Sequence, residues 1–471
     1  MKKITIDPVT RIEGHAKIDI YLDDAGHVSD TQFHVTQVRG FEKFTEGRPF
    51  YEMPSITARI CGICPVSHLL ASSKACDAIM AVEPPETGAK LRELVHCAQF
   101  VQSHALSFFH LSAPDLLLGF DSDPARRNVF GLIEQNPEAA KAGVALRKFG
   151  QELIEGLAKE RIHPSWIVPG GVNAPLAPEV RERTLAGLPE ARTLARYALS
   201  AFKGLLETFP EEIANFGSAP SMYAGLVDAS GGLQWYEGGL TFKDAEGQVV
   251  EGGIRARDYA QYIGEASLKN SYLKAPYFKS QGYPAGVYRV GPLARLNVAE
   301  HFGTPEADKE LAEFRQRCGA VAHSSFYFHY ARLLELIHGL EKIEILLADP
   351  ATLGRHVRAH APVNCLEGVG MIEAPRGVLI HHYKVDETGA MKWANLIVAT
   401  GHNNLAINRS VAQVAKHFID GTHLQEGMLN RVSAVVRAYD PCLSCSTHAD
   451  GTLEMEIKLI GPDGALLDYL R

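Results

Sequence analysis

The sequence lacks a hydrophobic run long enough to cross a membrane, since no uninterrupted apolar stretch of about 18 residues occurs. Its start, Met1 to Asp7, has neither an apolar signal core nor a twin-arginine pair. Basic runs are also missing, and the formal net charge of -8 disfavours nucleic acid as the main partner. We therefore expect a cytoplasmic protein with no membrane span and no nucleic-acid site.

The motifs that bind nucleotides in familiar folds are absent as well. No G-x-G-x-x-G follows a strand-like segment, and no G-x-x-x-x-G-K-[ST] occurs. Internal repeats and low-complexity tracts are missing too. We therefore do not expect nicotinamide or flavin to bind this chain in the familiar way.

What the sequence does contain is the composition of a large globular protein. Of its 471 residues, 46% are hydrophobic and 22% are charged, which favours one large domain or two to three subdomains. Alternating segments near both ends, with Gly26 in one turn and Gly461 to Gly464 in the other, predict an N-terminal and a C-terminal β-hairpin. The stretch from Gly232 to Glu251 predicts a small β excursion.

The long middle of the chain is expected to be helical, because apolar residues recur with a period of about 3.6 from Thr87 onward. Further helical segments are predicted at 136–160, 178–208, 305–348 and 405–419. The fold class is therefore α+β and mainly helical, with a large helical bundle as its core. The predicted divisions are a hairpin with the first metal-binding loop (1–86), the bundle (87–430), and the second metal-binding loop with the tail (431–471).

Eight cysteines are present, and four of them form two C-x-x-C pairs. Cys61 and Cys64 lie near the start of the chain, and Cys442 and Cys445 lie near its end. Four thiolates suit zinc, nickel or the iron of an iron–sulfur centre. We expect Arg59, next to the first pair, to compensate the negative charge. The others, Cys76, Cys97, Cys318 and Cys365, are scattered singletons, typical of buried thiols.

Two other interpretations of the pairs stay open on spacing alone. A structural zinc site is one, although the pairs of zinc ribbons usually lie only about 15–20 residues apart. A thioredoxin-like redox pair is the other, although neither pair lies in a βαβ pattern. Pairs drawn from opposite ends of a long chain favour an assembled active site.

In context, both pairs resemble the signature motifs of nickel–iron hydrogenase large subunits. Asp7 to His15 resembles the first motif of that family, and Arg39 to Phe44 resembles its second. Further motifs follow in the order of the family: His163-Pro164, Pro169-Gly170-Gly171-Val172, Val290 to Arg295, and Glu373 to Gly377. The resemblance is strongest to the soluble NAD(P)-linked bidirectional subgroup, with the run His381-His382-Tyr383 as one of its signs.

This resemblance implies a metal centre and its ligands. Cys61, Cys64, Cys442 and Cys445 would bind nickel, and Cys64 and Cys445 would also bridge to an iron that carries cyanide and carbon monoxide. Glu42 and His448 resemble the ligands of a separate divalent ion, usually magnesium. Such a hard ion prefers oxygen ligands, so chemistry alone would not select a histidine.

The resemblance also implies roles in catalysis. Cys442 would be the base that takes a proton from H2, and Glu13 the next acceptor, although Glu13 also suits a structural salt bridge. Arg376, helped by Pro375, would overhang the open metal position. Asp440 would pair with such an arginine. Thr400 would hydrogen-bond an iron-bound cyanide. The histidines at 68 and 104 fit hydrogen-bonding core positions.

Two features depart from the family pattern. Membrane-bound relatives carry an aspartate where this chain has Ser103, which implies a less charged canopy over the metals. Family precursors carry a tail that a dedicated protease removes after metal insertion, and Ala449 to Arg471 would be such a tail. Maturation factors and a C-terminal protease are therefore expected partners.

The family resemblance implies that electrons leave through other subunits. An iron–sulfur small subunit is expected to dock here, joined to flavin- and NAD-binding diaphorase subunits that hold the clusters, flavin and NAD(P). The implied activity is reversible H2 cleavage coupled to NAD(P)+. The alternatives are another soluble acceptor, such as a deazaflavin or a disulfide reductase, and an H2 sensor that signals to a kinase.

Overall fold

The computed structural model describes residues 2–448, 457–460 and 465–470. Its N-terminal sheet is antiparallel and comprises β1 (Lys2–Ile6), β2 (Ala16–Leu22) and β3 (Val28–Val35). The predicted hairpin is confirmed as β2 and β3, and β1 adds an unpredicted third strand on the outer side of β2. Short helices α1 (Phe41–Phe44) and α2 (Met53–Ala58) then lead to the first cysteine pair.

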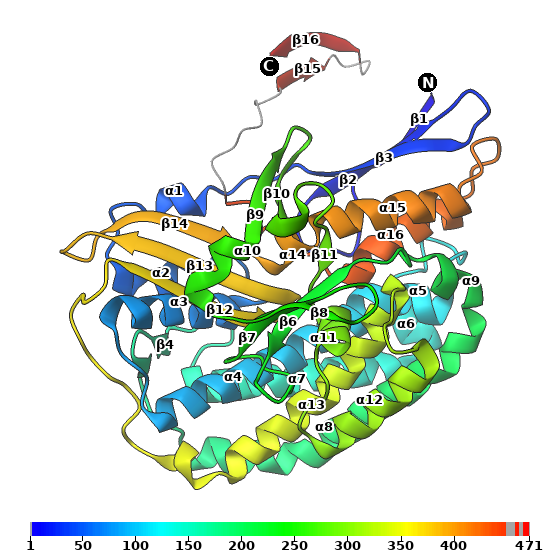
Figure 1. Ribbon diagram of the computed structural model, residues 1–471. Coiled ribbons are helices and arrows are strands. Elements are labelled where there is room, and N and C mark those ends of the chain that lie inside the picture. Colours follow the sequence, from blue (N-terminus) through cyan, green and yellow to red (C-terminus); the bar gives the residue numbers. More distant parts are fainter. Residues whose placement is uncertain (1, 449–456, 461–464, 471) are drawn as a thin grey trace.

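The body of the molecule is a layer of long helices that gather on one side of the sheets (Figure 1). The helix α13 packs against both α4 and α8, and α7 packs between α4 and α8. The long helices of this layer are α4 (Glu86–Ala105), α7 (Pro137–Ala158), α8 (Pro178–Leu205), α12 (Pro305–Cys318) and α13 (Phe328–Ala348). The predicted mainly helical α+β class is thus confirmed.

Two helical segments show where the apolar periodicity of the sequence predicts a helix correctly and where it does not. On α7, buried Ala139, Ala142, Leu146 and Leu153 recur at helical spacing and form one apolar face. The segment 305–348 is two helices rather than one, because Gly319 (φ 84°) adopts a conformation that ends the first. The smaller helices of this region are α5 (Ala113–Leu118), α6 (Val129–Gln135), α9 (Pro210–Asn215) and α11 (Pro292–Val298).

The β structure in the middle is larger than the predicted excursion at 232–251. One sheet has the order β11-β6-β7-β8, and β9 with β10 forms a separate hairpin. The bounds are β6 (Met222–Val227), β7 (Gly239–Lys243), β8 (Val249–Ile254), β9 (Ile263–Leu268), β10 (Ser271–Phe278) and β11 (Tyr288–Arg289). The strands β6 and β7 are buried along most of their length and so do not alternate, and sequence pattern alone underestimated this region.

A third sheet was not predicted, and it is the one that reaches the cysteine pairs. Its strands are β12 (Glu367–Ala374), β13 (Gly377–Val385) and β14 (Met391–Ile397), joined as antiparallel neighbours. The helix α3 (Pro65–Met80), also unpredicted, packs against β12 and β13. Both α3 and the three strands are largely buried, so their sequences carry little amphipathic pattern.

The chain returns to the core through α14 (Ala399–His402), α15 (Asn404–Phe418) and α16 (Glu426–Tyr439). The predicted helix at 405–419 is confirmed as α15. The C-terminal hairpin is present as β15 (Ile457–Ile460) and β16 (Leu466–Leu470), which pair in antiparallel fashion, whereas its expected turn at 461–464 lies outside the described residues. The division into three segments stays a prediction.

Among the residues that the structure describes, no helix is both long and apolar enough to span a membrane. The expected cytoplasmic location stays a prediction.

Candidate metal centre

The two cysteine pairs come together in the interior. The sulfur atoms of Cys61 and Cys442 are 3.4 Å apart, those of Cys64 and Cys445 are 3.4 Å apart, and those of Cys442 and Cys445 are 2.8 Å apart. All four ligand atoms lie within 4.8 Å of one another, all four residues are buried, and none forms a disulfide. Corresponding members of the two pairs are 381 residues apart in sequence, yet they form one cluster.

The geometry of this cluster fits a single metal ion. Metal–sulfur bonds of about 2.3 Å in a tetrahedral site place neighbouring sulfurs about 3.8 Å apart, near the two separations of 3.4 Å and longer than the separation of 2.8 Å between Cys442 and Cys445. One metal ion can accept the lone pairs of four buried sulfurs that lie this close together, and it stabilises the sulfurs as thiolates. Sulfur ligands of this kind suit nickel, zinc or iron, so geometry alone leaves the ion open.

The loop between Cys61 and Cys64 is held by neutral groups, while the charged Arg39 donates to the carbonyl of Ile60 just before it at 2.8 Å. Cys64 is the N-terminal cap of α3, and Pro65 occupies the first turn, where a missing N–H costs nothing. The backbone N–H of Ile63 donates to the sulfur of Cys61 at 3.2 Å. Two amides of α4, from Gln99 and Gln102, donate to the carbonyl of Ile63 at 2.8 and 2.7 Å. The loop between the two cysteines is therefore fixed from the opposite side by α4.

The second pair is held by charged groups. Asp440 ends α16 in the left-handed region (φ 53°), which turns the chain toward Cys442. Arg376, from the turn between β12 and β13, donates from Nε to the carbonyl of Asp440 at 2.7 Å and from Nη2 to its carboxylate at 3.1 Å. Ser103 Oγ lies 3.4 Å from Nη1 of the same guanidinium.

Arg376, and not Arg59, is the cation beside the sulfurs. Arg59 is exposed and donates to the carbonyl of Ser55 at 2.6 Å, so the expectation that it compensates the cluster is wrong. Burial alone would lower the pKa of Arg376, but Asp440 and the cysteine sulfurs raise that pKa well above its ordinary value. Burial also raises the pKa of Asp440, against the opposing effect of Arg376 and Arg332.

Pro375 and Thr400 serve as structural neighbours of the second pair. The carbonyl of Pro375 accepts a hydrogen bond from Nη2 of Arg295 at 2.9 Å, which braces the turn that carries Arg376. Thr400 Oγ1 accepts a hydrogen bond from the backbone N–H of Cys442 at 2.8 Å. Arg295 belongs to the motif Val290 to Arg295, but the sequence alone indicated no role for it.

Glu13 lies directly against the second pair. Its backbone forms a β-bridge with Cys442, and its carbonyl accepts from the N–H of Leu443 at 3.1 Å. Its carboxylate accepts from the N–H of Ser444 at 3.0 Å. Gly14 (φ 86°) allows this approach, since a Cβ there would lie 2.7 Å from the Cβ of Leu443. The N-terminal motif and the C-terminal motif thus share one backbone contact.

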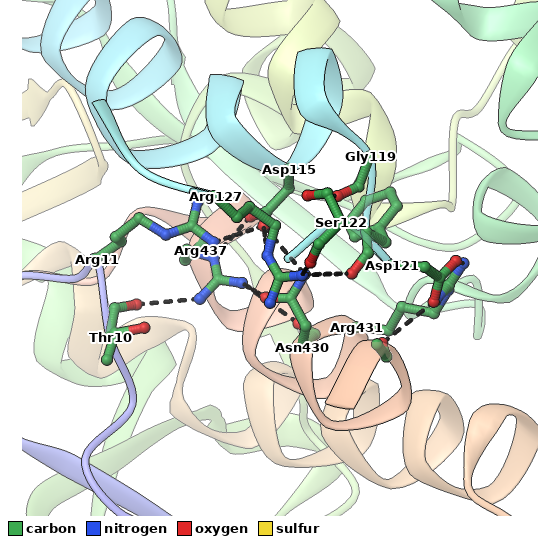
Figure 2. Close-up of polar contacts among 12 residues, drawn as sticks. Thr10, Arg11, Asp115, Gly119, Asp121, Ser122, Arg127, Asn430, Arg431 and Arg437 are labelled. Atoms are coloured by element: carbon green, nitrogen blue, oxygen red, sulfur yellow. Dashed lines mark hydrogen bonds and ion pairs between the residues drawn. The ribbon is translucent and has the colours of Figure 1, made fainter. Parts of the chain in front are cut away.

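Asp115 on α5 clamps the same two segments, a role that sequence reasoning missed (Figure 2). Its carboxylate accepts from Arg11 Nη2 at 2.5 Å and from Arg437 Nε at 2.9 Å. Arg437 also donates to the carbonyl of Thr10 at 3.1 Å. Arg127 Nε lies 3.5 Å from the same carboxylate. Because Asp115 belongs to no motif, nothing in the local sequence indicated this role.

The predicted pair Glu42 and His448 lie together beside a small cavity, which Lys274 and Glu265 also line. The carboxylate of Glu42 accepts from the N–H of Leu396 at 2.9 Å. Neither ring nitrogen of His448 has a hydrogen-bond partner within the described part of the chain, and burial lowers the pKa of His448 to about 3. The cysteine cluster is nevertheless the one group of three or more metal-type ligands found among the described residues.

The remaining predicted residues are two histidines and four single cysteines, and they differ in burial and in hydrogen bonding. His68 and His104 are hydrogen-bonded core histidines, to His381 at 3.1 Å and to Glu335 at 2.8 Å. The expectation of buried singleton thiols holds for Cys76 and Cys97 but is wrong for Cys365, which is exposed, and for the half-buried Cys318.

Comparison with known proteins identifies relatives along the whole chain. The profile of the family described as nickel-dependent hydrogenase matches residues 39–121 and 226–448, and one described as HoxL-like matches residues 3–38. The beta subunit of the NAD-reducing hydrogenase HoxS of Cupriavidus necator is 40% identical over 99% of each chain. A subunit of the F420-non-reducing hydrogenase vhu of Methanocaldococcus jannaschii is 43% identical over 88% of this chain and 99% of its own.

A solved structure resembles the fold closely. A crystal structure of an NAD+-reducing [NiFe]-hydrogenase in the H2-reduced state superposes with a TM-score of 0.93 and 45% sequence identity, covering 95% of this chain and 100% of the other.

Proposed function

The chain belongs to the nickel-dependent hydrogenase family, as its family match and its near full-length relatives show, and from this premise we propose the details of its activity. It is the catalytic large subunit of an enzyme that cleaves H2 reversibly into protons and electrons and passes the electrons toward NAD(P)+. The observation that carries the proposal is the cluster of four buried cysteine sulfurs within 4.8 Å of one another.

The four sulfurs would hold a nickel–iron centre, in which Cys64 and Cys445 would be ligands of both metals and the iron would also carry cyanide and carbon monoxide. When bound, this centre polarises H2 so that a nearby base can take its proton. Arg376 lies over the sulfurs, and its charge stabilises four thiolates in a buried site. Asp440 fixes its guanidinium, and Pro375 shapes the turn that carries it.

Protons leave through the second pair. The sulfur of Cys442 takes the first proton, and the carboxylate of Glu13, on the chain segment bridged to Cys442, takes it next. Glu13 is held by the N–H of Ser444, which keeps its carboxylate against the loop of the second pair. Thr400 fixes the backbone of Cys442, and its hydroxyl would be the group that donates to a cyanide on the iron. Ser103 leaves the canopy less charged than an aspartate would.

Glu42 and His448 are proposed as ligands of a magnesium ion beside the centre. The support is the pair of unpartnered nitrogens of His448 next to the carboxylate of Glu42. Residues 449–471 are proposed as the tail that a protease removes after metal insertion, with the help of maturation factors. The tail begins directly after His448.

Electrons pass to an iron–sulfur small subunit, then to flavin- and NAD-binding subunits. The support is that this chain has no nucleotide-binding motif, that its other cysteines are scattered, and that the C. necator relative is itself one subunit of an NAD-reducing hydrogenase. The methanogen relatives, at 39–43% identity, favour a second candidate in which another soluble acceptor replaces NAD(P)+.

The test is H2-dependent reduction of a viologen dye, NAD+, NADP+ and a deazaflavin by the complex purified with its native subunits. We expect dye reduction together with NAD+ or NADP+ reduction. Dye reduction without nicotinamide reduction would favour the second candidate. Slow reduction of every acceptor would favour an H2 sensor, and no H2-dependent reduction would contradict the proposal.

A further inference from the structure

A buried ion pair joins Arg295 on α11 to Glu335 on α13, and both side chains are fully buried. The guanidinium of Arg295 donates from Nε to one carboxylate oxygen of Glu335 and from Nη2 to the other, the second at 2.7 Å. Its Nη1 donates to a second buried carboxylate, that of Glu373, at 2.7 Å. The proposed function uses neither carboxylate, so the charges in this part of the core need a separate explanation.

The remaining N–H groups of Arg295 reach the turn that carries Arg376. Nη1 also donates to the carbonyl of Ala374 at 3.0 Å, and Nη2 donates to the carbonyl of Pro375 at 2.9 Å. Gly291 (φ 96°), the N-cap of α11, allows this approach, since a Cβ there would lie 2.7 Å from the carbonyl oxygen of Arg376. All five N–H groups of the guanidinium are therefore used, and two of them fix the carbonyls that come directly before Arg376.

Glu335 connects the same ion pair to a second neighbour of Arg376. The Nε2 of His104 on α4 lies 2.8 Å from a carboxylate oxygen of Glu335. His104 directly follows Ser103, whose Oγ lies 3.4 Å from Nη1 of Arg376. Arg295 and Glu335 together therefore hold the turn that carries Arg376 and the helix residue beside its guanidinium.

The pair is ionised although it is buried. Burial would raise the pKa of Glu335, but Arg295 and His104 lower that pKa to about 2. Burial lowers the pKa of His104 to about 4, so its ring is neutral and donates to the carboxylate. A buried ion pair is often no more stable than apolar side chains of the same volume. The pair is therefore better explained by the geometry that it fixes, since a guanidinium that binds a carboxylate through two N–H groups is held in one orientation.

We propose that Arg295 and Glu335 are positioning residues that hold the guanidinium of Arg376 in place beside the cysteine sulfurs. Asp440 fixes the guanidinium end of that side chain, and Arg295 fixes the backbone from which the side chain starts. The inference rests on the proposed function, in which Arg376 overhangs the open metal position. A small displacement of a group at the reacting centre has a large effect on rate, even when its cause lies farther away.

The test is H2-dependent dye reduction by the purified, metal-loaded complex, with turnover expressed per nickel, for Arg295→Lys, Arg376→Lys and the double variant. Lysine keeps the charge of Arg295 but cannot bind two carboxylates and two carbonyls in the fixed geometry of a guanidinium. We expect Arg295→Lys to lower kcat roughly 100-fold, with the KM for the dye unchanged. In the Arg376→Lys background the same substitution should cause no further fall, because its effect passes through Arg376.

The matched control is Arg92→Lys. Arg92 on α4 is also fully buried, donates from Nη1 to the carboxylate of Asp77 at 2.6 Å, and donates to the carbonyls of Val168 and Gly171 at 2.6 and 3.0 Å. It is the same kind of arginine, but its printed partners do not include the turn between β12 and β13. Its replacement should lower the melting temperature about as much as Arg295→Lys does, and should leave kcat per nickel unchanged.

Glu335→Gln is a milder second variant, in case Arg295→Lys does not take up metal. The amide keeps the shape of the side chain but offers one acceptor oxygen where the carboxylate offers two. We expect kcat per nickel to fall in the same direction by a smaller factor, and again only when Arg376 is present.

An unchanged kcat in Arg295→Lys, an equal fall in Arg92→Lys, or a further fall in the Arg376→Lys background would overturn the inference while leaving the proposed function intact. Loss of nickel from both Arg295→Lys and Glu335→Gln, with nickel retained in Arg92→Lys, would also overturn it, because the pair would then build the centre rather than position Arg376. A wild-type complex with neither nickel nor H2-dependent dye reduction would instead reject the proposed function, and the inference with it.

Discussion

The two cysteine pairs have the same spacing but are held by different forces. Amide hydrogen bonds from α4 hold the loop of the first pair, between Cys61 and Cys64. The second pair follows a buried set of charges in which Arg376 binds Asp440 and Arg437 binds Asp115. The first loop leads directly into α3, of which Cys64 is the N-cap, whereas the second lies against the distant N-terminal segment at Glu13.

This difference predicts which part of the site tolerates substitution and which part does not. A neutral hydrogen bond contributes only about 1 kcal/mol net, and a carbonyl with two donors tolerates the loss of one. A buried ion pair contributes little as a pair, but removing one partner leaves an uncompensated charge and costs about 3–5 kcal/mol. We therefore expect substitutions around the second pair to have larger effects than those around the first.

The largest expected effect is that of Cys442→Ser, which removes the proposed base of the second pair. H2-dependent dye reduction should fall to background because the hydroxyl is a poor replacement for a thiolate as base and as ligand. The fold should be largely retained, with a melting temperature close to that of the metal-free wild type. Wild-type turnover in this variant would contradict the role of Cys442.

Asp115→Asn should have the next largest effect, because it leaves the buried Arg437 and the partly buried Arg11 without their carboxylate. Urea unfolding of the metal-free chain should show a loss of about 3–5 kcal/mol. Asp121→Asn is the matched control: it removes the partner of Arg431 in the pair that Figure 2 draws, but Asp121 is exposed. It should cost less than about 1 kcal/mol. Equal losses in the two variants would refute the clamp.

Glu13→Gln should slow proton exchange more than it affects metal loading. The glutamine oxygen can still accept from the N–H of Ser444, so the backbone contact with the second pair persists. The rate of H2/D2O exchange should fall roughly 100-fold, the lower range for loss of a general acid–base group. Nickel and iron contents measured on the same sample serve as the control. An unchanged exchange rate would reject the relay.

The smallest effect is expected for Gln102→Leu at the first pair. The carbonyl of Ile63 keeps its hydrogen bond from Gln99, so stability should fall by only about 1 kcal/mol. The double variant with Gln99→Leu should lose more than the sum of the single variants, because the carbonyl is then left without a donor. Additive losses would show that the two amides act independently.

The sequence predicted well what depends on local pattern. The hairpin β2–β3 and the helices α4, α7, α8 and α15 follow from alternation and helical periodicity. The helix α3 and the sheet β12–β14 were missed because they are buried on more than one face and carry little pattern. The break at Gly319 was missed because the apolar period continues across it.

The candidate site was predicted in part, and for a physical reason. A pair of cysteines spaced C-x-x-C indicates metal binding in any fold. Cys61, Cys64, Cys442 and Cys445 could therefore be identified from the sequence alone. Charge compensation depends on where side chains point in space, so Arg59 was the wrong choice and Arg376 the right one. Asp115 gave no local signal at all, since its partners Arg11 and Arg437 are 104 and 322 residues away in sequence.

The most direct measurement for the central claim is the metal content of the purified wild-type complex, alongside the Cys64→Ser variant. We predict nickel in the wild type in amounts that match this chain, with iron beyond that of the cluster-bearing subunit, and loss of nickel in the variant. Zinc alone in the wild type, or nickel that survives unchanged in the variant, would contradict the account.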